Sequence, residues 1–172
     1  MPSSPTIPRA LAVSALACGA VVALSGCGVL NSVLGTQGNV FDLGVGDCFT
    51  EDEMNSVLGS EEVSDIPLVD CSEEHDSEIY HVETLPEGDY PGDSVVSTAA
   101  DETCGTRLAE FVGVAYDDEI LSYGVPAGDS TIYYGALLPI ESSWDFENGR
   151  DITCYAVIVG ETVTGTLSGY AA

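Results

Sequence analysis

Cysteines are the strongest restraint on the fold of this chain. Two lie in an apolar segment near its start, and four more follow, namely Cys48, Cys71, Cys104 and Cys154. In an exported protein, four such cysteines predict two disulfides, for which three pairings are possible. We favour the local link Cys48–Cys71 together with Cys104–Cys154, which would tie a central helix to a late strand. An oxidised Cys71 could act neither as a nucleophile nor as a zinc ligand, because both roles need the thiolate.

The apolar segment indicates export. Arg9 precedes an uncharged run over residues 10–27, which is short for a bilayer-spanning helix of roughly 20 apolar residues. Its last four residues, Leu-Ser-Gly-Cys, resemble the lipobox of bacterial lipoproteins, in which the cysteine receives a diacylglycerol and the chain is cut just before it. The resemblance implies a lipoprotein signal peptide over residues 1–26, lipidation of Cys27, and a spacer over residues 27–38. An ordinary cleaved signal and an uncleaved anchor are the alternatives.

The charge of the chain restricts its partners. It contains no lysine and only three arginines against 29 acidic residues, with a formal net charge of −26. Such a surface repels nucleic acid, and it excludes functions that hold phosphates in basic patches. The acidic residues are scattered among apolar ones, which is typical of a folded domain with an acidic surface. We therefore expect one domain over residues 39–172 and no binding of nucleic acid.

Hydrophobic patterns predict an α+β fold, a small antiparallel sheet with one main helix packed across it and two disulfides. Strands are expected over residues 40–45, 66–71, 77–85, 131–139 and 152–160, with a weak edge strand over 163–170. A short helix or ordered loop is expected within residues 51–65. The main helix is predicted over residues 94–112, with Asp93 as its N-cap. Its apolar stripe comprises Val96, Ala99, Ala100, Thr103, Cys104, Leu108 and Phe111.

The stretch CSEEHDSEIY, residues 71–80, is the densest group of chemically active side chains. One hypothesis is a divalent-metal or acid/base site built from His75, Asp76 and Glu78, with His81 as a further ligand. The alternative is a tight turn whose polar side chains bond to the backbone while His75 packs locally. We favour the turn, since a single histidine makes a poor zinc site, and we expect no metal and no cofactor.

Catalytic motifs are missing from the sequence. It has no G-x-S-x-G stretch, no phosphate-binding glycine loop and no H-E-x-x-H, so we expect a protein that is not an enzyme. Trp144 is a candidate partner-binding aromatic, although burial beneath its loop is the favoured interpretation because tryptophan is highly buried on average. Arg150 is expected to form a structural ion pair with Asp76 or Glu78.

An ordered series of short motifs suggests a family. The series comprises VFDLGVGDCF, VDCSEEHDSEIY, LPEGDYPGD, the Cys104 helix followed by EFVGV, then P-x-x-x-S-W, G-R-x-I-x-C and TGTLSGY. Together these motifs resemble the septum formation family of actinobacterial envelope proteins, over most of residues 40–170. The resemblance implies a link to cell division, and it supplies no reaction and no catalytic residues.

These observations lead to one hypothesis with two alternatives. The chain is expected to be a non-enzymatic envelope lipoprotein, held at the extracytoplasmic face of the cell membrane, that binds an envelope or divisome protein during septum formation. The first alternative is a divalent-metal-binding domain that uses the turn. The second is a sensor that reports the redox state of the envelope through its cysteines, which requires at least one strained, reducible disulfide. The candidate binding residues are His75, Asp76, Glu78, Trp144 and Arg150.

Overall fold

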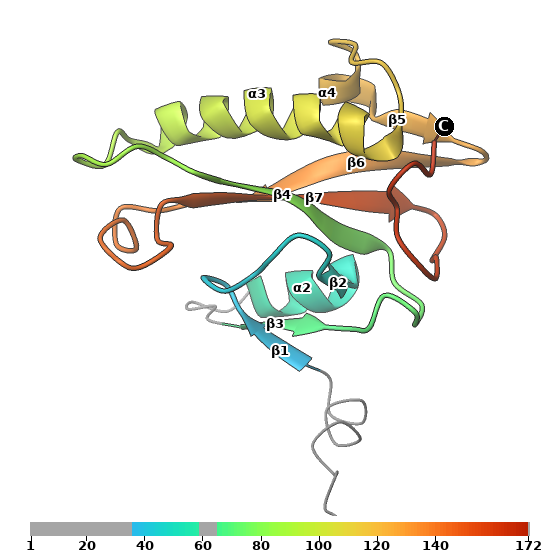
Figure 1. Cartoon of the computed structure of the whole chain (residues 1–172), viewed down its shortest axis with the longest axis horizontal. Coiled ribbons are helices and arrows are strands. Elements are labelled where there is room, and N and C mark those ends of the chain that lie inside the picture. The colour runs from blue at the N-terminus through green and yellow to red at the C-terminus, as the bar shows by residue number, and fades with distance from the viewer. Residues whose placement is uncertain (1–35, 59–64, 172) are drawn as a thin grey trace, which may run out of the picture.

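The computed structural model describes residues 36–58 and 65–171 (Figure 1). The predicted signal peptide, the predicted lipidation site Cys27 and nearly all of the predicted spacer lie outside the described residues. The elements, in chain order, are β1 (Thr36–Asn39), β2 (Cys48–Phe49), α2 (Glu51–Leu58), β3 (Asp65–Leu68), β4 (Ser77–Thr84), α3 (Asp93–Val112), α4 (Ile120–Tyr123), β5 (Val125–Ala127), β6 (Ser130–Leu137) and β7 (Asp151–Val159).

A five-stranded antiparallel sheet in the order β2-β4-β7-β6-β5 forms the centre of the domain. Figure 1 shows α3 along one face of this sheet, while α2 and the two-stranded sheet β1-β3 lie against the other. The predicted α+β class, with one main helix on an antiparallel sheet, is confirmed. The helix α2 and the strand β3 correspond to the short helix or loop expected within residues 51–65 and to the strand expected over residues 66–71. The strand β1, and the packing of these three elements into a second layer, were not predicted.

The sheet has an apolar cluster on each face. Alternate residues of β7, among them Ile152, Cys154 and Ile158, belong to the cluster beneath α3. Between them, Tyr155 turns to the opposite face and meets Phe49 edge-on at a centroid distance of 5.3 Å. Because side chains alternate along a strand, a sheet covered on both faces needs apolar residues at nearly every position. This explains the continuous apolar runs that predicted β6 and β7.

The main helix begins and ends at glycines. Gly92 is its N-cap with φ 96°, and Gly113 closes it in the left-handed conformation, where its N–H donates to the carbonyl of Ala109. Asp93 was wrongly predicted as the N-cap; it lies in the first turn, and its carboxylate accepts a hydrogen bond from the Tyr90 hydroxyl at 2.5 Å. The predicted apolar stripe does face the sheet.

Two predicted strands are absent from the part of the chain that the structure describes. Residues 40–45 form turns, because Asn39 Oδ1 accepts from the amide of Phe41 and Asp47 Oδ2 accepts from the amide of Gly44. Residues 163–170 make only a single bridge, between Val163 and His75. In both places, local side-chain bonds or glycine turns replace the sheet ladder that the alternation suggested.

The disulfide pairing follows the prediction. Cys48–Cys71 joins β2 to the turn after β3, with the Cα atoms 5.4 Å apart, and Cys104–Cys154 joins α3 to β7 at 5.5 Å. The first bond closes a local loop, whereas the second fastens the helix to the middle strand of the sheet. Both sides of the domain are therefore crosslinked.

Candidate functional site

The candidate site lies in the segment between β3 and β4, residues 70–76, which we call the His75 turn. Asp70 starts it, since its backbone carbonyl accepts from the amide of Glu73 and its Oδ1 accepts from the amide of Ser72. Hydrogen bonds from the backbone amide and then the side chain of Ser72 lower the pKa of the exposed Asp70 carboxyl from its usual value. The turn is thus a hydrogen-bonded structure with a charged acceptor at its first residue.

His75 is completely buried at the end of this turn. Its backbone pairs with Val163 in both directions, and its Nδ1 lies 2.9 Å from the carbonyl oxygen of Glu73. Because a carbonyl can only accept, Nδ1 carries a proton, and in the neutral ring Nε2 then has a free lone pair. That Nε2 is buried, and no described residue gives it a hydrogen-bond partner.

The two carboxylates of the stretch hold distant parts of the chain. Asp76 Oδ1 accepts from the amide of Glu51 at 2.8 Å, where α2 begins, and also from the hydroxyl of Ser77. Glu78, only 4% exposed, accepts from the Thr166 hydroxyl and from the amide of Leu167 at 2.6 Å. Carboxylates satisfied by backbone amides near a helix N-terminus and in a buried segment stabilise the fold.

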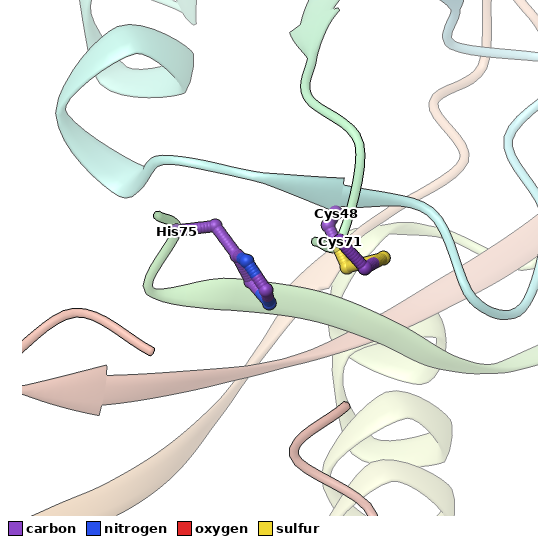
Figure 2. Close-up of side chains that lie close together, drawn as sticks. All are labelled: Cys48, Cys71 and His75. Carbon is purple, nitrogen blue, oxygen red and sulfur yellow. A yellow bond between two sulfur atoms is a disulfide. The ribbon is translucent and has the colours of Figure 1, made fainter. Parts of the chain in front are cut away.

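The structure does not gather the predicted set of metal ligands. His81 lies beyond an irregularity in the β4–β7 pairing, with its Nε2 3.5 Å from Glu83. Across residues 36–58 and 65–171, one group of three possible ligands converges, and it consists of Cys48, Cys71 and His75. Their ligand atoms all lie within 4.8 Å of one another, and Figure 2 shows the three side chains between β2 and the start of β4.

Sequence reasoning missed Cys48 as a neighbour of His75. The two residues are far apart in the chain, and their approach depends on the pairing of β2 with β4. The predicted disulfide carried part of this information, because it brings Cys48 to Cys71 at the foot of the same turn.

The remaining candidate residues lie elsewhere. Trp144 is buried, as the favoured interpretation expected; its Nε1 donates to the carbonyl of Gly88 at 2.6 Å, and its ring meets Tyr90 edge-on. Arg150 pairs with the exposed Glu87 at 3.7 Å, so the prediction of Asp76 or Glu78 as its partner was wrong. A loose pair of this kind at the surface contributes little to stability.

A second feature with functional potential is the segment between β6 and β7, residues 138–149, which we call the 138–149 loop. It exposes three apolar side chains, Leu138, Ile140 and Phe146, the last of which is 61% exposed. The backbone beneath them is held by Ser143, whose hydroxyl bonds to the carbonyls of Ile140 and Gly149. The loop therefore presents apolar side chains on an ordered support.

The fold is that of a small, doubly crosslinked α+β domain whose polar turn is committed mainly to structure. The chain belongs to the septum formation family, whose family model matches residues 15–130. This confirms the resemblance found in the sequence, and it indicates a role in septum formation and an association with the envelope or with cell division. Neither the curated proteins nor the solved structures include a match to the chain. Among the described helices, none has the length and apolar character needed to cross a membrane.

Proposed function

We propose that this chain is a non-enzymatic, lipid-anchored module that binds a protein partner at the extracytoplasmic face of the cell membrane during septum formation. Three observations support the proposal. The family model is that of septum formation. Residues 24–27 have the sequence of a lipobox, and the four remaining cysteines form two disulfides, as is usual for exported domains.

The 138–149 loop carries the partner-binding part of this proposal. Ile140 and Phe146 are 56% and 61% exposed, so most of their apolar surface contributes nothing to the core. Phe146 also meets the ring of Phe41 edge-on at 6.1 Å, which restrains its position. An apolar side chain already held in place loses little conformational freedom when it docks, and aromatic anchors of this kind dominate many interfaces.

The surroundings of this apolar patch indicate the chemistry of the partner. Glu141, Asp145 and Glu147 are exposed on the same loop. A partner that seats Phe146 therefore needs an apolar pocket rimmed by lysine or arginine side chains. Charge complementarity of this kind speeds association and rejects acidic competitors.

Localisation is the first test. A fluorescent fusion of the full chain is imaged in dividing cells beside a Cys27→Ala variant. We expect enrichment at the division site that the variant loses, because the acyl chains provide the membrane attachment. A uniform envelope signal from the unmodified chain would refute the septal part of the proposal, and unchanged enrichment of the variant would refute the lipid anchor.

A matched pair of variants tests the docking surface. Phe146→Ser removes the exposed aromatic of the 138–149 loop, whereas Tyr123→Ser removes a comparably exposed aromatic (71%) at the end of α4. We expect Phe146→Ser to disperse the septal signal and to abolish crosslinking of the partner by a photoreactive amino acid placed at position 140. Tyr123→Ser should leave both the signal and the crosslink intact. Equal behaviour of the two variants would refute this loop as the docking surface, provided that both melt like the unmodified protein.

A further inference from the structure

We infer that the corner formed by Cys48, Cys71 and His75 is a latent metal site, which binds a zinc-class ion once the disulfide is reduced. The ligand atoms already lie within 4.8 Å of one another. Two thiolates and one imidazole are a ligand set that suits Zn²⁺, with a water in the fourth position. The oxidised protein has no thiolate to offer, so the redox state of one disulfide would decide whether the ion binds.

His75 has the arrangement of a metal-binding histidine. Its Nδ1 is held by the carbonyl of Glu73, so that Nε2 is left as the atom with the lone pair. Metal-bound histidines characteristically donate their other ring N–H to a carbonyl or a carboxylate, which fixes the ring and its tautomer. The buried Nε2 has no partner within the described residues, and an unsatisfied buried acceptor is unfavourable unless something binds it.

The three side chains are positioned by bonds that do not depend on the disulfide. The carbonyl of Cys48 accepts from the amide of Val69, and Cys48 also pairs with Glu78 in the sheet. The carbonyl of Cys71 accepts from the amide of Gly165, and His75 is paired with Val163. Reduction should therefore free the two sulfur atoms while leaving their backbone in place.

The geometry suits a tetrahedral ion. Two Zn–S bonds of about 2.3 Å at a tetrahedral angle place the sulfurs about 3.8 Å apart. Once the bond between them is broken, small side-chain rotations reach this separation. The exposed carboxylates of Glu73 and Glu74 lie on the same turn, where they raise the local concentration of cations.

The reaction needs a reductant, for which we propose a dithiol. One of its thiolates attacks Cys71, which is the more exposed partner. This forms a mixed disulfide between the reductant and Cys71 and releases Cys48 as the thiolate. The second thiol then closes the disulfide of the reductant and releases Cys71. Two electrons and two protons pass from the dithiol to the cysteine pair, and Zn²⁺ binding displaces the two protons to water. The other disulfide is expected to resist, because Cys104 and Cys154 are completely buried.

The test uses the full chain with Cys18→Ser and Cys27→Ser, so that only the four paired cysteines remain. A trialkylphosphine is the reductant; it becomes the phosphine oxide with oxygen from water, and it does not compete as a thiolate. We expect two free thiols per chain. Added Co²⁺ should then produce a sulfur-to-cobalt charge-transfer band, which one equivalent of Zn²⁺ abolishes. The oxidised protein is the matched control, since it carries the same carboxylates without thiolates.

A His75→Gln variant separates this site from simple binding by two thiols. We expect its zinc affinity to fall by more than the roughly 10- to 100-fold that even outer-shell partners contribute. X-ray absorption of the zinc-loaded unmodified protein should show two sulfur ligands and at least one nitrogen ligand, a result that does not require the variant to fold. Each of three results would overturn the inference. The first is the absence of a charge-transfer band in protein with two free thiols, the second is a zinc coordination shell without nitrogen, and the third is an equal zinc affinity of the His75→Gln variant and the unmodified protein. A count of four thiols would overturn selective reduction.

Discussion

Replacing Tyr80 by phenylalanine should change the alkaline stability of the domain in a characteristic way. Tyr80 is buried between β4 and α3, where its ring stacks on Phe111 at 5.2 Å and its hydroxyl donates to the carbonyl of Cys104 at 2.7 Å. Phenylalanine keeps the ring and removes only this hydrogen bond. At pH 7 we expect the variant to lose about 1 kcal/mol of unfolding free energy.

Above pH 10 the comparison should reverse. Burial raises the pKa of the Tyr80 hydroxyl far above its usual value of 10.0, and Tyr134 adds a smaller effect. The unfolded chain releases this proton near pH 10, whereas the folded protein retains it. The contribution of the Tyr80 hydroxyl to the free energy of unfolding is therefore fully present below pH 10, and it is lost as the pH rises. The slope is about 1.4 kcal/mol for each further pH unit. Since the chain contains no lysine, tyrosines dominate the titration in this range.

The two effects predict a crossing point. Relative to the phenylalanine variant, which shares the other tyrosines, the unmodified protein loses about 1 kcal/mol by pH 10.7 and about 2 kcal/mol by pH 11.5, so the stability curves should cross near pH 10.7. By pH 11.5 the phenylalanine variant should be the more stable by about 1 kcal/mol. Both curves are measured by urea unfolding between pH 7 and pH 11.5, followed by the fluorescence of Trp144, the single tryptophan, which is buried. Both proteins carry Cys18→Ser and Cys27→Ser, so that neither has a free cysteine. Parallel curves over the whole range would refute the reasoning.

Three further predictions concern folding and are measured by urea unfolding at pH 7. Glu78→Ala should cost about 2–3 kcal/mol, because it leaves the buried amide of Leu167 without its charged acceptor, and a loss below 0.5 kcal/mol would contradict that role. Gly135→Ala should cost about 1–3 kcal/mol because its methyl overlaps a packed tyrosine ring, whereas Gly44→Ala, with open space around it, should stay within about 0.5 kcal/mol. Serine in place of both cysteines of Cys104–Cys154, which are 50 residues apart, should cost about 4 kcal/mol, against about 3.4 kcal/mol for the 23-residue Cys48–Cys71 link.

Patterns that repeat along the chain predicted the large elements correctly. The stripe of the main helix recurs with helical spacing over about four turns, and β6 and β7 are long apolar runs, so that each signal comes from many residues. The alternation over residues 40–45 failed for the opposite reason. It involves few residues, and the side chains of Asn39 and Asp47 stabilise turns there more effectively than a strand would.

The candidate site could be predicted only in part. Sequence correctly placed His75 in a turn beside a disulfide, but its Cys48 neighbour comes from strand pairing rather than from spacing. The structural role of Glu78 could not be predicted either, because its carboxylate accepts a hydrogen bond from the amide of Leu167, 89 positions further along the chain. Interactions over such separations leave no local pattern in a single sequence.

The sequence by itself therefore determined the α+β class, the main helix, the central strands, the presence of two disulfides and the family, since each of these rests on periodicity, cysteine placement or an ordered series of motifs. The pairing of the cysteines was a preference among three possibilities, which the structure confirmed. Only the tertiary structure decided what the polar residues near Cys71 do. Packing brings the N-terminal layer and the C-terminal segment onto the His75 turn, so Asp76 and Glu78 bind backbone amides from opposite ends of the chain. The same packing leaves the Nε2 atom of His75 unpaired and brings the His75 side chain close to two sulfur atoms. The physical reason is that burial and hydrogen bonding are settled by neighbours in space, which the order of residues does not specify.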